Sequence, residues 1–380
     1  MTDDSAGKKN RYNIKLMNSN QYCIIMAGGH LNRFWPISRE DMPGHFLDIS
    51  GNGKSLVRMA YDRCVGVVPQ ENIIVVTLSK FKDLVITQIP ELSEENLLLE
   101  PYGRRTGPCV AYSTYPLLKT NPDAVMAVTP SDLIIRDEDM FRKALSDALD
   151  YASANPVLMS LGVKPSSPDT EFGYIQAVGG REACSKNEPV KVKTFTEKPD
   201  KEIAEVFYKS GEFFWNSGIF VWQANVIKEE MEKHVPEITR LFDGWEGALG
   251  TRAEEVFIER AYADCLKISI DYGVMEKTDK AWVYPVNFGW SDIDSWDALY
   301  SNMPDKDKDG NLSNTRSRIL QKDRRNIILS SNKDKLVAIR GLEDCIVIDT
   351  DDVLLICPRD DRQYKELITG TGMPGFDEYR

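Results

Sequence analysis

Residues 21–46 read QYCIIMAGGHLNRFWPISREDMPGHF, and this stretch decides the fold of the chain. The run YCIIM is short and apolar, which is typical of a buried strand. It leads into Gly28 and Gly29, where the missing side chains let the backbone approach a base or a phosphate closely. Arg33 then supplies a permanently charged guanidinium. This outline is typical of a nucleotide-binding loop, although glycine pairs also occur in ordinary turns.

Downstream of this loop, short β-rich runs alternate with longer amphipathic stretches. The runs include NIIVVT, NLLLEP and AVMAVTP, and the longer stretches include SLVRMAYDRC and GPCVAYSTYPLLK. This alternation is typical of βαβ units and predicts an α/β fold with a Rossmann-like, mostly parallel sheet covered by helices on both faces. Ligands of such sheets lie beyond the carboxyl ends of the strands.

The chain has 380 residues, which favours more than one domain. Residues 1–20 are polar and have no hydrophobic period, so we expect a mobile tail. Residues 21–300 form the expected large α/β domain. Residues 301–380 start with the polar linker NMPDKDKDGNLSN and continue with short β-branched runs such as RNIILSS and CIVIDT. Such runs predict a small C-terminal all-β domain that is β-helix-like.

The composition excludes several classes of function. The formal net charge of -12 disfavours nucleic acid and anionic membranes as partners. The polar N-terminus resembles neither a signal peptide nor a membrane span. The seven cysteines occur singly, without a CxxC pair, and the three histidines lack the spacing of a zinc site. We therefore expect a cytoplasmic protein with no nucleic-acid or membrane partner.

The loop after the first strand resembles the N-terminal signature of mannose-1-phosphate guanylyltransferases, G-G-x-G-(T/S)-R-(L/F)-W-P-x-S-R followed by P-K-Q-F. The matching residues are Arg33, Phe34, Trp35, Pro36, Ser38, Arg39, Pro43 and Phe46. Further matching segments are EPYGRRTGP (100–108), TPSD (129–132), FGYI (172–175), FTEKP (195–199), WNSGIF (215–220), DYGVMEK (271–277) and GWSDIDSW (289–296). Their order and spacing match the family over almost the whole chain.

The resemblance implies transfer of GMP from GTP to mannose 1-phosphate, which gives GDP-mannose and pyrophosphate, with Mg²⁺ as the cofactor. The sugar phosphate would attack the α-phosphorus in line. No side chain has to act as a nucleophile, because a sugar phosphate is already anionic near neutral pH. Catalysis would then consist of positioning and charge neutralisation.

The resemblance also implies roles for individual residues. Asp132 and Asp292 would hold Mg²⁺, which prefers oxygen ligands. Arg33 would contact the leaving pyrophosphate and Lys198 the sugar phosphate, which completes the expected catalytic set. The expected substrate-binding residues are Gly28, Gly29, Glu100, Gly173, Tyr174, Glu197 and Asn216. Taken singly, Asp132 could equally cap a turn, and an exposed Glu-Lys pair is usually a solvated surface.

Seven positions depart from the family pattern: Leu31, Asn32, Gly44, Arg105, Leu133, Glu171 and Asp294. Leu31 replaces a glycine of the first loop and Gly44 replaces the lysine of P-K-Q-F, so elements that handle phosphate are altered. Two alternatives therefore stay open. One is a catalytically weak paralogue that binds a sugar nucleotide and regulates another enzyme, and the other is a transferase for another sugar 1-phosphate or base. A homodimer through an open β edge of the C-terminal domain is the expected assembly.

Overall fold

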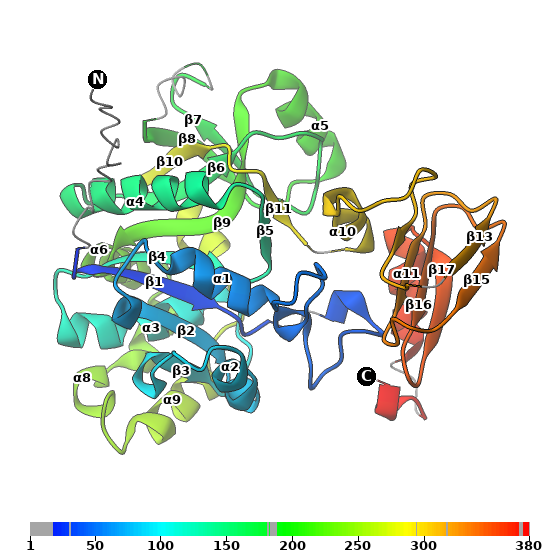
Figure 1. Ribbon diagram of the computed structural model, residues 1–380. Helices are drawn as coiled ribbons and strands as arrows, with labels where there is room; N and C mark the ends of the chain where they lie inside the picture. Colours follow the sequence, from blue (N-terminus) through cyan, green and yellow to red (C-terminus); the bar gives the residue numbers. More distant parts are fainter. Residues whose placement is uncertain are drawn as a thin grey trace, which may run out of the picture.

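The computed structural model describes residues 18–29, 32–180, 182, 188–293, 295–316, 318–371 and 375–379. These residues form a large α/β domain and a smaller β-rich domain beside it (Figure 1). The expected mobile tail lies outside the described residues except for its last three, which lead into the first strand. Leu31 and Asp294 also lie outside them.

The large domain is built on a nine-stranded sheet with the order β3-β2-β1-β4-β9-β6-β10-β8-β7. The strands are β1 (Gln21–Met26), β2 (Ile73–Leu78), β3 (Leu97–Glu100), β4 (Val125–Pro130), β6 (Leu158–Val163), β7 (Tyr174–Ala177), β8 (Val190–Thr196), β9 (Phe213–Gln223) and β10 (Ala281–Val286). The first strand starts at Gln21, as the sequence predicts. A separate two-stranded sheet joins β5 (Leu133–Ile135) and β11 (Trp290–Asp292).

The sheet is parallel in one half and largely antiparallel in the other. Strands β3, β2, β1 and β4 are parallel neighbours, and β6 is parallel to β10. The long strand β9 runs antiparallel to its neighbours β4 and β6. Strand β7 pairs antiparallel with both β8 and β9. The expectation of a mostly parallel sheet therefore holds for the half made of β3, β2, β1 and β4.

Helices cover both faces of this sheet, as expected. One face carries α1 (Leu56–Cys64), α2 (Lys82–Gln88) and α4 (Glu138–Ala154), and the other carries α3 (Thr106–Thr120), α6 (Ala224–His234) and α9 (Glu254–Ala263). The alternation along β1 explains the two layers, because Cys23 and Ile25 join one core and Ile24 the other. The other α-helices described up to residue 302 are α5 (Lys201–Ser210), α7 (Pro236–Thr239), α8 (Trp245–Ala248) and α10 (Trp296–Asn302).

The C-terminal domain is a stack of short parallel strands. Strands β12 (Leu312–Ser313), β14 (Ile327–Ser330) and β16 (Cys345–Asp349) pair in parallel, as do β13 (Arg318–Gln321) and β15 (Val337–Arg340). At one corner the Asn326 amide donates to Asn311 and accepts from the backbone N–H of Cys345, which links successive coils. Strand β17 (Leu354–Pro358) then pairs antiparallel with β16, and helix α11 (Asp361–Thr371) follows. This arrangement fits the expected β-helix-like fold.

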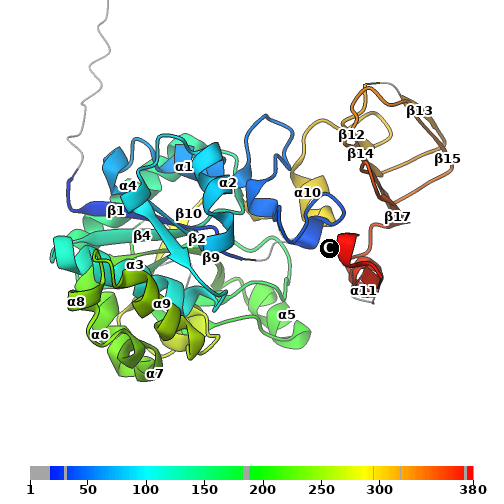
Figure 2. The ribbon, with the colours of Figure 1, turned by 90° about the horizontal axis from the view of Figure 1, so that it is seen from below.

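The first loop lies between the two domains. The ring of Phe34 packs edge-on against Trp296 at 5.1 Å between centroids, in an apolar cluster that also contains Tyr364 of α11. The Tyr364 hydroxyl donates to the backbone carbonyl of Trp35 at 2.8 Å. Arg39 donates to Asp352 and to the carbonyl of Tyr379. Seen from below, α11 lies on the side of the C-terminal domain that faces the larger domain (Figure 2).

None of the described helices combines the length and the apolar character that crossing a membrane requires.

The contact between α11 and the first loop can be tested through Tyr364. Tyr364→Phe keeps the ring but leaves the Trp35 carbonyl without this donor, so we expect a loss of about 1 kcal/mol in the free energy of unfolding. Tyr364→Ala also empties the buried ring site and should cost about 3–5 kcal/mol. Urea unfolding measures both, with Tyr208→Phe on exposed α5 as the control. A Tyr364→Ala protein as stable as the control would contradict the role of this contact.

Candidate functional site

The residues expected to form the site lie along one edge of the sheet. The first loop follows β1, Glu100 ends β3, and Asp132 follows β4. Asn216 lies near the start of β9, opposite Gly162 at the end of β6, and Gly173 immediately precedes β7. Because β9 is antiparallel, its beginning falls at the same edge as the carboxyl ends of the parallel strands. The topology therefore brings segments distant in sequence to one edge of the sheet.

Gly28 lies directly over the Glu100 carboxyl group. A Cβ at Gly28 would stand 2.7 Å from Oε2 of Glu100, so a side chain there would displace the carboxyl group. The Tyr262 hydroxyl donates to Oε1 of Glu100 at 2.9 Å. Burial raises the pKa of the Glu100 carboxyl to about 8, despite this hydrogen bond. Near neutral pH, Glu100 is therefore mostly uncharged beneath the first loop.

His45 ties the first loop to the segment that carries Asp132, and the sequence motifs did not single it out. Its Nε2 lies 3.1 Å from the carbonyl oxygen of Gly29, and its Nδ1 lies 2.8 Å from the hydroxyl of Ser131. His45 is buried. His45 stands in PGHF where the P-K-Q-F signature has glutamine. This position could have indicated its role, because glutamine and histidine can both bridge two polar groups.

Asp132 and Asp292 are brought together by the small β5–β11 sheet. Asp292 is the register partner of Leu133, and the backbone N–H of Ile293 donates to the carbonyl of Asp132 at 3.3 Å. Both aspartates are half-buried. No group of three or more His, Cys, Asp or Glu side chains suited to a metal occurs among the described residues. A pair of carboxylates suits a hard divalent cation that takes its remaining ligands from phosphates and water.

A pair of carboxyl groups, Glu197 and Asp271, lies beside Asn216 and Gly173. Burial first, and the neighbouring Asp271 second, raise the pKa of Glu197 to about 8. Burial also raises the pKa of Asp271, a residue of η8 (Asp271–Met275). Oε2 of Glu197 is buried and has no hydrogen-bond partner in the described part of the chain. A Cβ at Gly173 would collide with this oxygen, so a side chain there would displace the Glu197 carboxyl group.

Asn216 is held by two protein neighbours. Its Nδ2 donates to Oδ1 of Asp271 at 2.8 Å, and its Oδ1 accepts from the Ser160 hydroxyl at 2.8 Å. This arrangement satisfies the expectation that a buried asparagine is hydrogen-bonded. It also fixes the amide beside Glu197, because Gly173 contacts both residues. Asp271 was missed as a site residue, although DYGVMEK was recognised as a segment.

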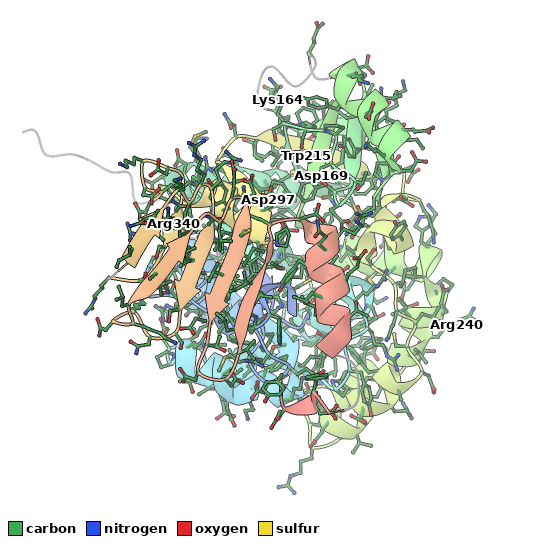
Figure 3. The ribbon with its side chains drawn as sticks, turned by 90° about the vertical axis from the view of Figure 1, so that its right-hand side faces the viewer. Lys164, Asp169, Trp215, Arg240, Asp297 and Arg340 are labelled. Carbon is green, nitrogen blue, oxygen red and sulfur yellow. The ribbon has the colours of Figure 1, made fainter. Side chains whose placement is uncertain are left out.

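Two further residues lie in different surroundings from those expected. The Tyr174 side chain is fully buried and donates to the backbone carbonyl of Asp169, so it supports the cleft wall from within. Lys198 has a left-handed backbone (φ 46°) and its Nζ lies 3.5 Å from Oε2 of Glu171. Arg33 is exposed in η1 (Asn32–Phe34). Figure 3 shows the molecule from the side of the C-terminal domain, with Trp215 and Asp169 labelled.

The remaining departures fall into different environments. Leu133 is buried in β5, where its side chain joins the core. Gly44 is buried in η2 (Gly44–Phe46), and Arg105 is exposed just before α3 with a φ of 68°. Glu171 is the one among these four that forms an ion pair with an expected catalytic residue.

The fold and this cleft define a nucleotidyltransferase. Residues 22–309 match the family described as nucleotidyl transferase, and residues 318–369 match the MannoseP isomerase/GMP-like β-helix domain. The chain therefore belongs to the nucleotidyl transferase family and carries the C-terminal domain seen in its mannose-1-phosphate branch.

Named relatives point to the same branch. The chain is 36% identical over 356 residues to the mannose-1-phosphate guanylyltransferase of Salmonella montevideo, covering 91% of this chain and 73% of that protein. It is 34% identical over 359 residues to the xanthan biosynthesis protein XanB of Xanthomonas campestris pv. campestris, covering 93% and 74%. A solved structure from Thermus thermophilus, named a mannose-1-phosphate geranyltransferase, has a TM-score of 0.80 at 29% identity and covers 93% of this chain and 100% of that one.

The raised pKa of Glu100 predicts a pH-dependent stability. Between the ordinary pKa of 4.5 and the raised value of about 8, the folded protein binds a proton that the unfolded chain has lost. The stability that this bound proton contributes is fully present below pH 4.5 and is lost as the pH rises towards 8. Glu100→Gln should therefore lose less stability between about pH 5 and 8 than the unmodified protein, by on the order of 2–4 kcal/mol.

Urea unfolding at a series of pH values measures this effect. The exposed Glu255→Gln variant on α9 serves as the control and should follow the unmodified protein. Parallel stability curves for Glu100→Gln and the control would show that Glu100 is ionised in the folded state.

Proposed function

We propose that the chain transfers GMP from GTP to mannose 1-phosphate and releases pyrophosphate. A phosphate oxygen of the sugar phosphate forms the new bond to the α-phosphorus. The bond from that phosphorus to the β-phosphate bridging oxygen breaks, and pyrophosphate leaves with the electron pair. The observation that carries the proposal is the site itself, which combines the neighbouring residues Asp132 and Asp292 with the buried Oε2 of Glu197, an atom without a hydrogen-bond partner among the described residues. The named relatives support mannose as the sugar.

In this mechanism the residues bind the substrates and neutralise the charges of their phosphate groups. They do not exchange protons with the reacting atoms. Gly28 and Gly29 let the nucleotide approach the backbone of the first loop. Arg33 neutralises the leaving pyrophosphate, and Lys198 neutralises the sugar phosphate. Asp132 and Asp292 hold Mg²⁺, which supplies charge neutralisation at the nucleotide phosphates when bound.

The sugar-side residues orient the acceptor. Glu197, mostly protonated near pH 7, can donate a hydrogen bond to a sugar hydroxyl, and its buried position excludes water. The Asn216 amide donates to Asp271 and also interacts with the Glu197 carboxyl group, so it holds the two carboxyl groups in place. Gly173 leaves room for Asn216 and Glu197. Glu100 contacts the nucleotide side from beneath Gly28. These assignments give each expected site residue a role in binding except Tyr174. Its side chain lies in the core and supports the loop at Asp169.

The first test is pyrophosphate release from purified protein given GTP, mannose 1-phosphate and Mg²⁺. Asp132→Asn should lower the rate by roughly 10²–10³, because a preorganised charge contact is lost. Asp123→Asn is a matched control, because Asp123 is exposed before the opposite end of β4. Equal rates for Asp132→Asn and Asp123→Asn would refute the assigned role of Asp132.

The same assay separates the two alternatives. A weak sugar-nucleotide-binding paralogue would release no pyrophosphate but would still bind GDP-mannose in calorimetry, and the Glu171–Lys198 ion pair favours this possibility. A transferase of different specificity would release pyrophosphate with another sugar 1-phosphate or another nucleotide in preference. Preference for GTP and mannose 1-phosphate supports the main proposal.

The proposed assembly is a homodimer through strand β17 and the neighbouring helix. Leu354 and Ile356 point outward from β17 and are 62% and 54% exposed, and Leu367 and Phe376 extend the apolar surface around a hollow of about 650 Å³. An apolar edge strand is a natural surface for a second copy. Ile356→Glu should therefore shift the mass measured by light scattering from dimer to monomer. Val256→Glu, also exposed but on α9, should remain dimeric, and a monomeric unmodified protein would contradict the proposal.

A further inference from the structure

His45 lies between the first loop and the segment that carries Asp132, and its own backbone is firmly held. The residue is 4% exposed and belongs to η2, whose last residue, Phe46, packs against Phe81 at 5.5 Å between ring centroids. The carbonyl of Phe46 also accepts from Nε2 of Gln88 on α2 at 2.9 Å. The core on this face of the sheet therefore fixes η2, and with it the backbone that carries the imidazole ring.

The two ring nitrogens of His45 have different partners, and these partners determine the tautomer. A backbone carbonyl can only accept a hydrogen bond, so Nε2, which lies 3.1 Å from the Gly29 oxygen, carries the proton. In the neutral ring, Nδ1 then accepts from the Ser131 hydroxyl at 2.8 Å. Ser131 is fully buried, so removal of the imidazole would leave a desolvated hydroxyl with one partner fewer.

Backbone hydrogen bonds continue from Ser131 to both aspartates. The N–H of Ser131 donates to the carbonyl of Met26, the last residue of β1, at 3.1 Å, and Asp132 follows directly. The carbonyl of Asp132 accepts from the N–H of Ile293, the residue after Asp292, at 3.3 Å. The backbone of Asp132 is therefore held by Ser131 on one side and by the end of β11 on the other.

At the other end of the imidazole, Gly29 is exposed and lies directly against the ring. A Cβ at Gly29 would stand 3.4 Å from Nε2 of His45. The Gly29 carbonyl oxygen carries a partial negative charge, which would repel a phosphate group if it turned towards one. The bond to Nε2 keeps this oxygen against the ring, so the exposed glycine backbone is preorganised before a nucleotide arrives.

We propose that His45 is a positioning residue, which couples the first loop to the Asp132–Asp292 pair so that the nucleotide and its metal ion bind in one arrangement. The inference rests on the proposed function and deepens it. His45 contacts neither the reacting atoms nor the metal aspartates through its side chain, and it acts through Gly29 and Ser131. The amide of a glutamine could make the same two hydrogen bonds, because it also combines a donor with an acceptor.

The experiment compares His45→Leu, His45→Gln and His234→Leu. Leucine removes both hydrogen bonds of His45, whereas glutamine can donate to Gly29 and accept from Ser131. His234 is a matched control, because it ends α6 on the other face of the sheet and its Nε2 lies 3.2 Å from Oε2 of Glu230. Calorimetry measures the affinity for GTP with and without Mg²⁺, and pyrophosphate release gives separate KM values for GTP and mannose 1-phosphate.

We expect His45→Leu to weaken binding of GTP with Mg²⁺, and to raise KM for GTP, roughly tenfold to a hundredfold, as for two lost hydrogen bonds. The gain in GTP affinity that Mg²⁺ confers should become smaller, because the aspartates are no longer coupled to the loop. KM for mannose 1-phosphate should not change, because Glu197 and Asn216 belong to other segments.

His45→Gln should restore most of the affinity, and His234→Leu should match the unmodified protein. Urea unfolding shows whether each variant is folded. If His45→Leu is not, Ser131→Ala takes its place, since it removes one of the two bonds and should weaken binding of GTP with Mg²⁺ several-fold. Equal affinities in His45→Leu and His234→Leu would overturn the inference, and so would a rise in both KM values that glutamine does not reverse.

The calorimetric arm separates this inference from the proposed function. If the unmodified protein binds GTP with Mg²⁺ but releases no pyrophosphate, the proposed function fails, and the affinities of the variants alone decide the role of His45. If the unmodified protein does not bind GTP at all, both the function and the inference are wrong.

Discussion

The edge-on contact between Phe34 and Trp296 is the interaction on which the rest of the site depends. It belongs to an apolar cluster that also contains Ile293 and Tyr364. Phe34 follows Arg33, Ile293 follows Asp292, and Tyr364 precedes Lys365 in the chain. The cluster therefore sets the positions of charged residues from three segments, of which Arg33 and Lys365 are exposed and Asp292 is half-buried. The two exposed cations avoid the desolvation cost that buried ions incur.

Electrostatics explain how an acidic chain can form a cleft for anions. Glu100 and Glu197 lie on opposite sides of the site, and burial raises the pKa of each to about 8. Both carboxyls are therefore mostly neutral near pH 7 and repel a phosphate less than ionised side chains would. The cationic side chains of Arg33 and Lys198, by contrast, are exposed. The cleft is thus less negative than its composition suggests.

The sequence predicted much of the fold, because local signals set local structure. The start of β1 at Gln21 and the helix that begins after Ser55 both followed from the apolar periodicity. The direction of β9 could not be predicted, because a strand has the same period whichever way it runs. His45 was missed for a related reason. Its partners Gly29 and Ser131 come from different segments, and only the packed chain brings them together. The roles assigned to the expected site residues stay predictions until they are measured.

The coils of the C-terminal domain act as a spacer. Asn311 and Asn326 link one coil to the next, and β12, β14 and β16 stack in parallel at the usual strand separation of about 4.8 Å. Each coil added or removed would therefore shift α11 by about that distance along the stack. A shift of this size exceeds the reach of a hydrogen bond. The number of coils therefore sets how far α11 lies along the stack, and it can change only by whole coils. Adding or removing one coil would separate α11 from the first loop.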